Sequence, residues 1–296
     1  MAGFRRETRL AVCRLTRIAA LAWLLAAVAL PAAAAPAAPV EAAAEEIVGI
    51  ATATGVVMRT RVFRPPGPGP FPLAVVSHGS PVDAARRPEM PIPAMPAISN
   101  WLLQRGYIVA LPLRRGYGET GGPWLENYGR CNDPDFYRAG LTTAEDIEAA
   151  ARFFRARADV ARNRVLLMGV SAGGWGSIAA ASQNPAGVFA VVNFAGGRAG
   201  HRPRVGNCTP QRLIDAAGRY GATAHVPSIW LYSANDTFFG PELSRRVFDA
   251  YVRAGAKAEY VALPAFGSDG HRLFGADAGR ALWQPPVGKF LATFRD

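Results

Sequence analysis

The chain has 296 residues, of which 50% are hydrophobic, and its 31 glycines and 24 prolines follow no repeat, so we exclude a disordered chain and a collagen-like fibre. The formal net charge of +11 comes almost wholly from scattered arginines without a nucleic-acid-binding motif, and we expect no nucleic-acid partner. The length suits one large globular domain or two small ones.

The first segment has the pattern of a secretory signal. Five arginines between Arg5 and Arg17 precede the uncharged run 18–30, and an alanine-rich stretch with several A-x-A cleavage choices follows. A membrane anchor is the alternative, but the apolar run is shorter than the roughly 20 residues that a spanning helix needs. We therefore expect residues 1–44 to be a signal peptide with a short Ala/Pro-rich segment, and the mature protein to be periplasmic or secreted, without a stable membrane anchor.

After this segment, short apolar runs alternate with helical patterns. Continuous apolar runs predict buried strands, and apolar residues at helical spacing predict amphipathic helices. Helix 142–158 would begin with a threonine cap and an acidic first turn, and would end in arginines. We expect strands at 45–52, 55–63, 71–79, 107–113, 164–170, 189–196, 226–233 and 258–264, and helices at 94–106, 142–158, from 173, at 209–221, 240–256 and 279–294. This alternation predicts a single α/β domain, 45–296, with a mostly parallel central sheet, helices on both faces and no large lid domain.

The pentapeptide GVSAG, residues 169–173, places Ser171 where a predicted buried strand turns into a helix. A sharp strand-to-helix turn strains its central residue and needs glycine-sized neighbours two positions away. The serine hydroxyl would then project above the carboxyl ends of the strands, where open α/β sheets bind ligands. We predict that Ser171 is a nucleophile.

A serine nucleophile needs a general base, and the chain has four histidines. His271 lies in a glycine-bearing loop between the last strand and the last helix, from which it could reach back across the sheet edge. His78 ends the strand 71–79 and is interpreted as structural, while His201 and His225 have no partner pattern. We therefore predict His271 as the base.

The base needs a carboxylate that fixes its tautomer. Asp236 follows the strand 226–233 at the carboxyl edge of the sheet, and the order Ser171, Asp236, His271 is the one expected of an α/β-hydrolase. Asp269, two residues before the histidine, is the less favoured alternative.

An oxyanion hole needs two backbone donors. We predict the amide of Ala172, at the start of the helix, and the amide of Ser80, which follows the strand 71–79 and precedes a proline that has no N–H. The alternative for the HGSP segment is a plain turn.

Of the three cysteines, Cys13 lies in the signal segment, which leaves Cys131 and Cys208. An even pair in an exported chain favours a disulfide over two separate buried thiols. The bridge would join two loops at the sheet edge, 114–140 and 196–207, into a small rigid roof.

These two loops also supply the predicted substrate contacts. Arg198, or one of Arg114 and Arg115, could clamp a substrate carboxylate, and Trp124 belongs to the minority of loop aromatics that would face the substrate. Trp175 in the elbow helix is expected in the core.

Five motifs carry a resemblance to a known family: HGSP, LPLRRGYGETGG, GVSAGGWGS, SANDTFF and GSDGH. On these motifs, residues 57–294 resemble the α/β-hydrolase superfamily, and within it the dienelactone hydrolase-like and prolyl-oligopeptidase-like esterases. The resemblance implies hydrolysis of a small-molecule carboxylic ester through an acyl-serine intermediate, with no cofactor and no metal. Dienelactone hydrolase itself uses a cysteine nucleophile, so Ser171 argues against a dienelactone substrate but leaves the acyl-transfer chemistry.

Three alternatives stay open. A peptidase would use the same triad on an amide, and an acyltransferase would prefer an alcohol to water as acceptor. A binding protein on a silent hydrolase fold would be expected to lack a triad residue, and none is missing here.

Overall fold

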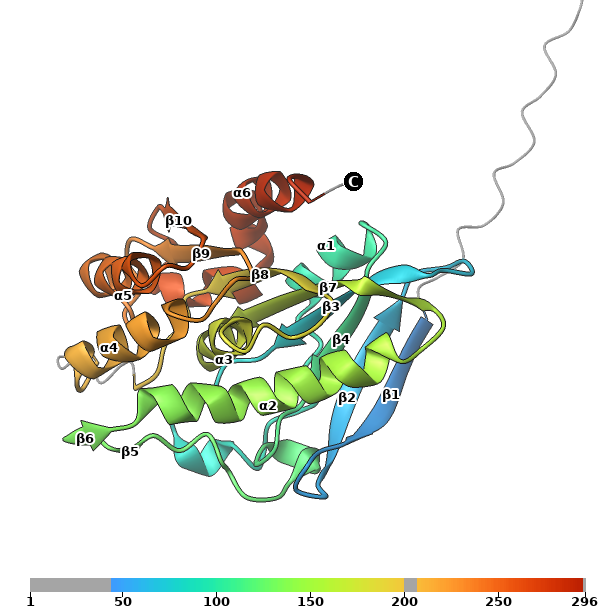
Figure 1. The fold of residues 1–296 in the computed structure, drawn as a ribbon, viewed down its shortest axis with the longest axis horizontal. Coiled ribbons are helices and arrows are strands. Elements are labelled where there is room, and N and C mark those ends of the chain that lie inside the picture. The colour runs from blue at the N-terminus through green and yellow to red at the C-terminus, as the bar shows by residue number, and fades with distance from the viewer. Residues whose placement is uncertain (1–43, 200–206, 295–296) are drawn as a thin grey trace, which may run out of the picture. The chain divides into compact units, whose positions relative to one another are not determined.

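The computed structural model describes residues 44–199 and 207–294, and Glu41–Asp296 is one compact unit (Figure 1). Residues 1–43 of the predicted signal segment 1–44, and His201, lie outside the described residues. None of the helices in the described ranges combines the length and the apolar character needed to cross a bilayer.

An eight-stranded sheet forms the centre of this unit, in the order β1-β2-β4-β3-β7-β8-β9-β10. β1 pairs with β2 and β2 with β4 in antiparallel fashion, and all later neighbours are parallel, as predicted for a mostly parallel sheet. The strands are β1 (Ala44–Ala51), β2 (Val57–Arg64), β3 (Phe71–Ser77), β4 (Ile108–Pro112), β7 (Val160–Val170), β8 (Val188–Phe194), β9 (Ser228–Ser233) and β10 (Ala258–Leu263).

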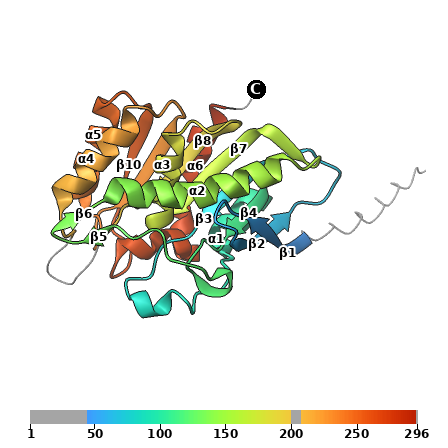
Figure 2. The same cartoon turned by 60° about the horizontal axis from the view of Figure 1, so that its bottom comes forward.

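Helices cover both faces of the sheet (Figures 1 and 2). One layer contains α2, α3, α4 and α5, which contact one another in sequence, and α1 and α6 lie on the opposite face. Short 3₁₀ turns and a two-stranded ribbon complete the described part, and no large lid domain occurs in it. The helices are α1 (Pro96–Leu103), α2 (Phe136–Arg155), α3 (Ala172–Ala181), α4 (Pro210–Gly221), α5 (Pro241–Arg253) and α6 (Arg280–Ala292); the ribbon is β5 (Gly129–Arg130) with β6 (Asp133–Pro134); the 3₁₀ turns are Ala84–Arg86, Gly118–Thr120, Gly270–Gly275 and Asp277–Gly279.

The start predicted for α2 was wrong. The helix begins at Phe136, where the side chain of Asp135 accepts a hydrogen bond of 2.8 Å from the amide of Arg138. The predicted cap Thr142 lies inside the helix, and its hydroxyl donates to the carbonyl of Arg138 at 3.1 Å. A threonine can satisfy its hydroxyl in this way, so the threonines followed by acidic residues imitated a helix start.

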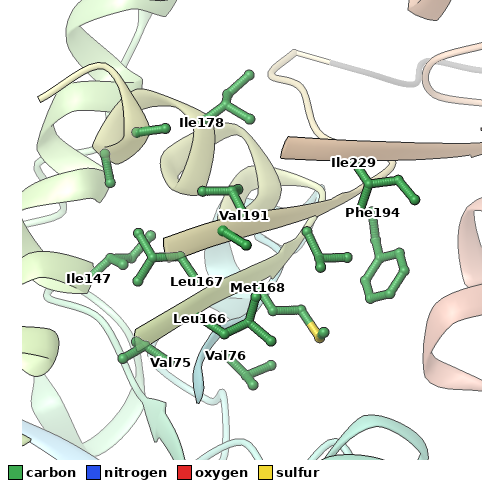
Figure 3. Packing of buried hydrophobic residues seen from close by; sticks show 14 of the residues in the cluster. Val75, Val76, Ile147, Leu166, Leu167, Met168, Ile178, Val191, Phe194 and Ile229 are labelled. Carbon is green, nitrogen blue, oxygen red and sulfur yellow. The ribbon is translucent and has the colours of Figure 1, made fainter. Parts of the chain in front are cut away.

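The inner strands β3, β4, β7, β8 and β9 are largely buried on both faces, which explains their uninterrupted apolar runs. Leu167 and Val191, in register on β7 and β8, lie on the side of Ile147 of α2 and Ile178 of α3 (Figure 3). Phe194 points to the opposite side. There its ring stacks on Phe274 and packs edge-on against Trp283 of α6, with centroid distances of 4.3 Å and 5.4 Å. The core therefore holds the carboxyl ends of β7, β8 and β9 in place from both sides.

Candidate active site

Ser171 occupies a strained turn between β7 and α3. Its φ of 56° and ψ of −120° are rare for a residue with a side chain. A Cβ atom on Gly169 would lie 2.3 Å from the carbonyl of Gly173, and a Cβ atom on Gly173 would lie 2.2 Å from the carbonyl oxygen of Ser77. Only glycine fits at these two positions, so the turn depends on the GVSAG sequence.

The backbone of Ser171 is tied to the end of β8. Its amide donates to the carbonyl of Phe194 at 2.9 Å, and its carbonyl accepts from the amides of Trp175 at 2.9 Å and Gly197 at 3.3 Å. The side chain hydroxyl makes no hydrogen bond to the described residues. The elbow is thus rigid, and its link to the base stays a prediction.

His271 and Asp236 form a hydrogen-bonded pair beyond the ends of β10 and β9. The imidazole Nδ1 lies 3.0 Å and 3.1 Å from the two carboxylate oxygens, and the Asp236 side chain is fully buried while His271 is 12% exposed. Asp236 also accepts hydrogen bonds from the amides of Phe238 and Phe239 at 2.8 Å and 2.9 Å. Since a carboxylate accepts, Nδ1 carries the proton and Nε2 presents a lone pair, as a general base requires.

Two further contacts restrain the histidine. The ring of Phe238 stacks on the imidazole at a centroid distance of 4.1 Å. Asp269 accepts from the backbone amides of His271 at 3.0 Å and Thr237 at 3.2 Å, and does not contact the imidazole nitrogens. Burial acts to raise the pKa of Asp269, but hydrogen bonds from the backbone of His271 and from the backbone and side chain of Thr237 oppose it, and that pKa lies below its usual value. Asp269 therefore stabilises the backbone of the loop that carries His271, whereas Asp236 binds the imidazole ring.

His78 is buried and neutral, in line with its structural interpretation. Burial and then the charge of Arg114 lower its pKa from 6.5 to about 3. Its Nδ1 donates to the carbonyl of Gly79 at 2.6 Å, and its Nε2 accepts from the amide of Arg114 at 3.2 Å. His225 lies at the surface, where its amide bonds Asn184.

Of the two predicted oxyanion donors, Ala172 follows the nucleophile directly in the chain, and Ser80 belongs to a distant segment that runs beside it. Ala172 is the first residue of α3, whose amide has no acceptor within the helix. The HGSP segment runs beside Ser171, since a Cβ atom on Gly79 would lie 3.3 Å from the Cβ of Ser171. Donation by the Ala172 and Ser80 amides stays a prediction.

A buried ionic cluster lies behind the HGSP segment, and sequence reasoning missed its central residue, Glu126. Its carboxylate contacts Arg114 through two hydrogen bonds, one of them at 3.3 Å, and Arg198 at 2.8 Å. All three side chains are at most 3% exposed. Burial acts to raise the pKa of Glu126, but the two arginines outweigh it and hold that pKa well below its usual range. The only sequence signal was a carboxylate in an arginine-rich loop.

The predicted substrate contacts are both engaged inside the protein. Arg198 bonds Glu126 and Thr143, although its buried Nε has no hydrogen-bond partner among residues 44–199 and 207–294. Trp124 donates from Nε1 to the hydroxyl of Tyr117 at 3.0 Å, and the guanidinium of Arg87 lies 3.4 Å above its ring. A substrate contact through Arg198 stays a prediction, and a substrate carboxylate would compete there with Glu126.

The structure contains the disulfide bond that the cysteine count favoured. Cys131, next to the β5–β6 ribbon, is bonded to Cys208, just before α4. Trp175 is fully buried, as expected, and donates to the carbonyl of Phe136 at 2.9 Å. Part of the second predicted roof loop lies outside the described residues, so the roof stays a prediction.

Comparisons with known proteins bear on the fold of the chain. A model of the prolyl oligopeptidase family matches residues 94–197, a range that includes Ser171 but neither Asp236 nor His271. Among curated proteins, none matches the chain.

Solved structures of both esterases and peptidases resemble the chain. A candidate dienelactone hydrolase from Klebsiella pneumoniae subsp. pneumoniae is 18% identical with a TM-score of 0.56, and the match covers 84% of this chain and 98% of that one. An esterase from Pyrococcus furiosus is 15% identical with a TM-score of 0.58, over 85% and 93% of the two chains. Dipeptidyl peptidase 4 from Porphyromonas gingivalis is 16% identical with a TM-score of 0.61, over 86% of this chain and only 35% of that one. The chain therefore has the α/β-hydrolase fold.

Proposed function

We propose that this chain is an exported serine hydrolase that cleaves carboxylic esters through an acyl-serine intermediate. The observation that carries the proposal is the His271–Asp236 pair, in which Nε2 of the imidazole is left as an acceptor. The pair lies beyond the same edge of the sheet as Ser171, which occupies the strained turn between β7 and α3. These residues follow β10, β9 and β7, which are parallel members of one sheet, so all three come after the same edge of that sheet.

The proposed reaction begins with attack of the Ser171 hydroxyl on the ester carbonyl while His271 takes the hydroxyl proton. Asp236 holds the imidazole and stabilises the imidazolium, and the amides of Ala172 and Ser80 bind the oxyanion. His271 then gives the proton to the leaving alcohol. Water repeats the sequence on the acyl-enzyme and releases the acid.

Export is the less direct part of the proposal. It rests on the arginine-rich, apolar and alanine-rich order of residues 1–44 and on the Cys131–Cys208 disulfide, because disulfides persist mainly in oxidising compartments. Fractionation of cells that produce the whole chain, with the N-terminus of the product sequenced, tests it. A product in the reducing cytoplasm that retains Met1 would contradict export.

A peptidase is the second candidate, because the matching family model is that of prolyl oligopeptidases and peptidases occur among the similar structures. The triad chemistry does not distinguish an ester from an amide. Parallel assays on an ester and the amide of the same acyl group decide between them. A peptidase must hydrolyse the amide at a measurable rate, whereas an esterase should hydrolyse the ester alone.

The first experiment is hydrolysis of p-nitrophenyl esters graded from acetate to long acyl chains. The protein lacking residues 1–44 is compared with Ser171→Ala and His271→Ala, and all three are treated with an organophosphonate that labels active serines. We expect activity on short esters that both substitutions abolish. No hydrolysis of any ester and no labelled serine would favour the binding-protein alternative.

A further inference from the structure

The buried cluster around Glu126 extends by hydrogen bonds to the segment beside the nucleophile. The hydroxyl of Tyr117, a fully buried residue, lies 2.9 Å from Oε2 of Glu126 and 2.9 Å from Oγ of Ser80. It also accepts from Nε1 of Trp124 at 3.0 Å. The phenol therefore stands between the ionic cluster and the predicted oxyanion loop.

The direction of these bonds follows from counting protons. A phenol has one proton, and the carboxylate of Glu126, kept ionised by Arg114 and Arg198, can only accept. Tyr117 therefore donates to Glu126, and its oxygen accepts from the Ser80 hydroxyl and the Trp124 indole. Every hydrogen-bonding position of the Tyr117 hydroxyl is then used, and the Ser80 hydroxyl is oriented towards it.

The same cluster holds the chain on the other side of the segment. Arg114 donates from a terminal nitrogen to the carbonyl of His78 at 2.7 Å, and its amide donates to the ring of His78. Between His78 and Ser80 lies Gly79, which packs against the Cβ of Ser171. The backbone beside the nucleophile is thus fixed at both ends by the buried cluster.

We propose that Tyr117, anchored by Glu126, is a positioning residue that holds the Ser80 amide at the place where the oxyanion develops. This inference rests on the proposed function and adds a residue that positions one of its oxyanion donors. Tyr117 does not touch the substrate, and it acts by restraining Ser80, because a preorganised donor is effective only at the position of the oxyanion.

Tyr117→Phe tests the link, because it removes the hydroxyl and keeps the ring that packs edge-on against His78 at 4.8 Å. We expect kcat to fall about 10- to 100-fold with little change in KM, as for a small displacement of a group that acts in the transition state. Ser80→Ala, which keeps the amide but cuts the same link, should lower kcat by a similar factor. The double variant should be no worse than either single one.

A transition-state analogue separates positioning from a general loss of structure. A trifluoromethyl ketone adds to the active serine and places an oxyanion in the hole, so its inhibition constant should rise by the factor by which kcat/KM falls. Tyr260→Phe is the matched control, because it breaks another tyrosine–serine hydroxyl contact, 2.8 Å to Ser244, that involves neither the HGSP segment nor the ionic cluster. It should leave both quantities unchanged.

Unchanged kcat in Tyr117→Phe and Ser80→Ala, in an unsubstituted protein that hydrolyses esters through Ser171, would overturn the positioning role alone. Additive losses in the double variant would overturn it as well. Absence of Ser171-dependent hydrolysis in the unsubstituted protein would instead overturn the proposed function. If Tyr117→Phe does not fold, Ser80→Ala and the ketone decide the question.

Discussion

Two polar assemblies lie at the carboxyl edge of the sheet, and they differ in what they leave unpaired. In the His271–Asp236 pair, one carboxylate receives three donors while the second ring nitrogen has no partner among the described residues. Around Glu126, the carboxylate and the Tyr117 hydroxyl are saturated with partners. A reactive group needs an unpaired hydrogen-bonding atom and partial exposure to reach the substrate. A buried charge instead needs opposite charges and hydrogen bonds that offset its desolvation. The first assembly therefore suits the catalytic role proposed for it, and the second suits the positioning role proposed for it.

Asp236→Asn should have the largest effect and would break this comparison if it did not. The amide N–H would face the Nδ1–H of His271 and favour the wrong tautomer, so we expect kcat for ester hydrolysis to fall roughly 10⁴-fold with the fold retained. Asp269→Asn is the matched control, because Asp269 accepts from the amides of His271 and Thr237 and does not contact the imidazole nitrogens, and it should keep most of the activity. The opposite ranking of the two variants would assign the acid to Asp269.

Glu126→Gln should act on stability more than on any acid–base step. It leaves Arg114 and Arg198 buried without a counter-charge, and breaking such a buried pair costs about 3–5 kcal/mol in the free energy of unfolding. Urea unfolding measures this loss. Glu119→Gln serves as a control, since Glu119 is 67% exposed and lies 3.8 Å from Arg59, and a surface pair of this kind is worth at most about 1 kcal/mol. Equal losses in both variants would show that burial of the cluster does not govern its contribution.

The disulfide should contribute on a similar scale, but through the unfolded chain. Cys131 and Cys208 are 77 residues apart, and the chain-entropy model gives about 4 kcal/mol for a loop of that size. Reduction, or Cys131→Ser with Cys208→Ser, should lower the urea midpoint accordingly. Ester hydrolysis should fall as well if the bridge holds a roof over Ser171, and undiminished activity would remove the roof hypothesis.

The smallest expected effect is the change in the free energy of unfolding per pH unit. The pKa of His78 is about 3 in the folded protein and near 6.5 when unfolded, so only the unfolded chain takes up this proton between those values. The contribution of His78 to stability is therefore fully present above pH 6.5. It is lost as the pH drops towards 3, by at most about 1.4 kcal/mol per pH unit. His78→Asn should flatten the slope of unfolding free energy against pH in this window. His225→Asn, at a surface histidine, should leave the slope as it is, and equal slopes in all three proteins would contradict the assignment.

Most of the fold was predictable because its signals are local. Continuous apolar runs marked the strands, since a parallel sheet with both faces covered has no polar side. The start of α2 was missed because Thr142 imitates a cap, while Asp135, the residue that caps the helix, follows a ribbon that the sequence did not indicate. The disulfide was favoured by a cysteine count, which names the partners once only two remain.

The sequence by itself determined the elbow and favoured the order Ser171, Asp236, His271 for the proposed triad, because only glycine fits at the two positions around Ser171 and few residues could fill the other roles. Tertiary structure alone decided which carboxylate meets His271 and which charges are buried together. Glu126 and Arg198 are 72 residues apart, and nothing local to either encodes their pairing. Contacts of that kind arise when separate strands end at one edge of a sheet, so they depend on the strand order and not on the neighbouring sequence.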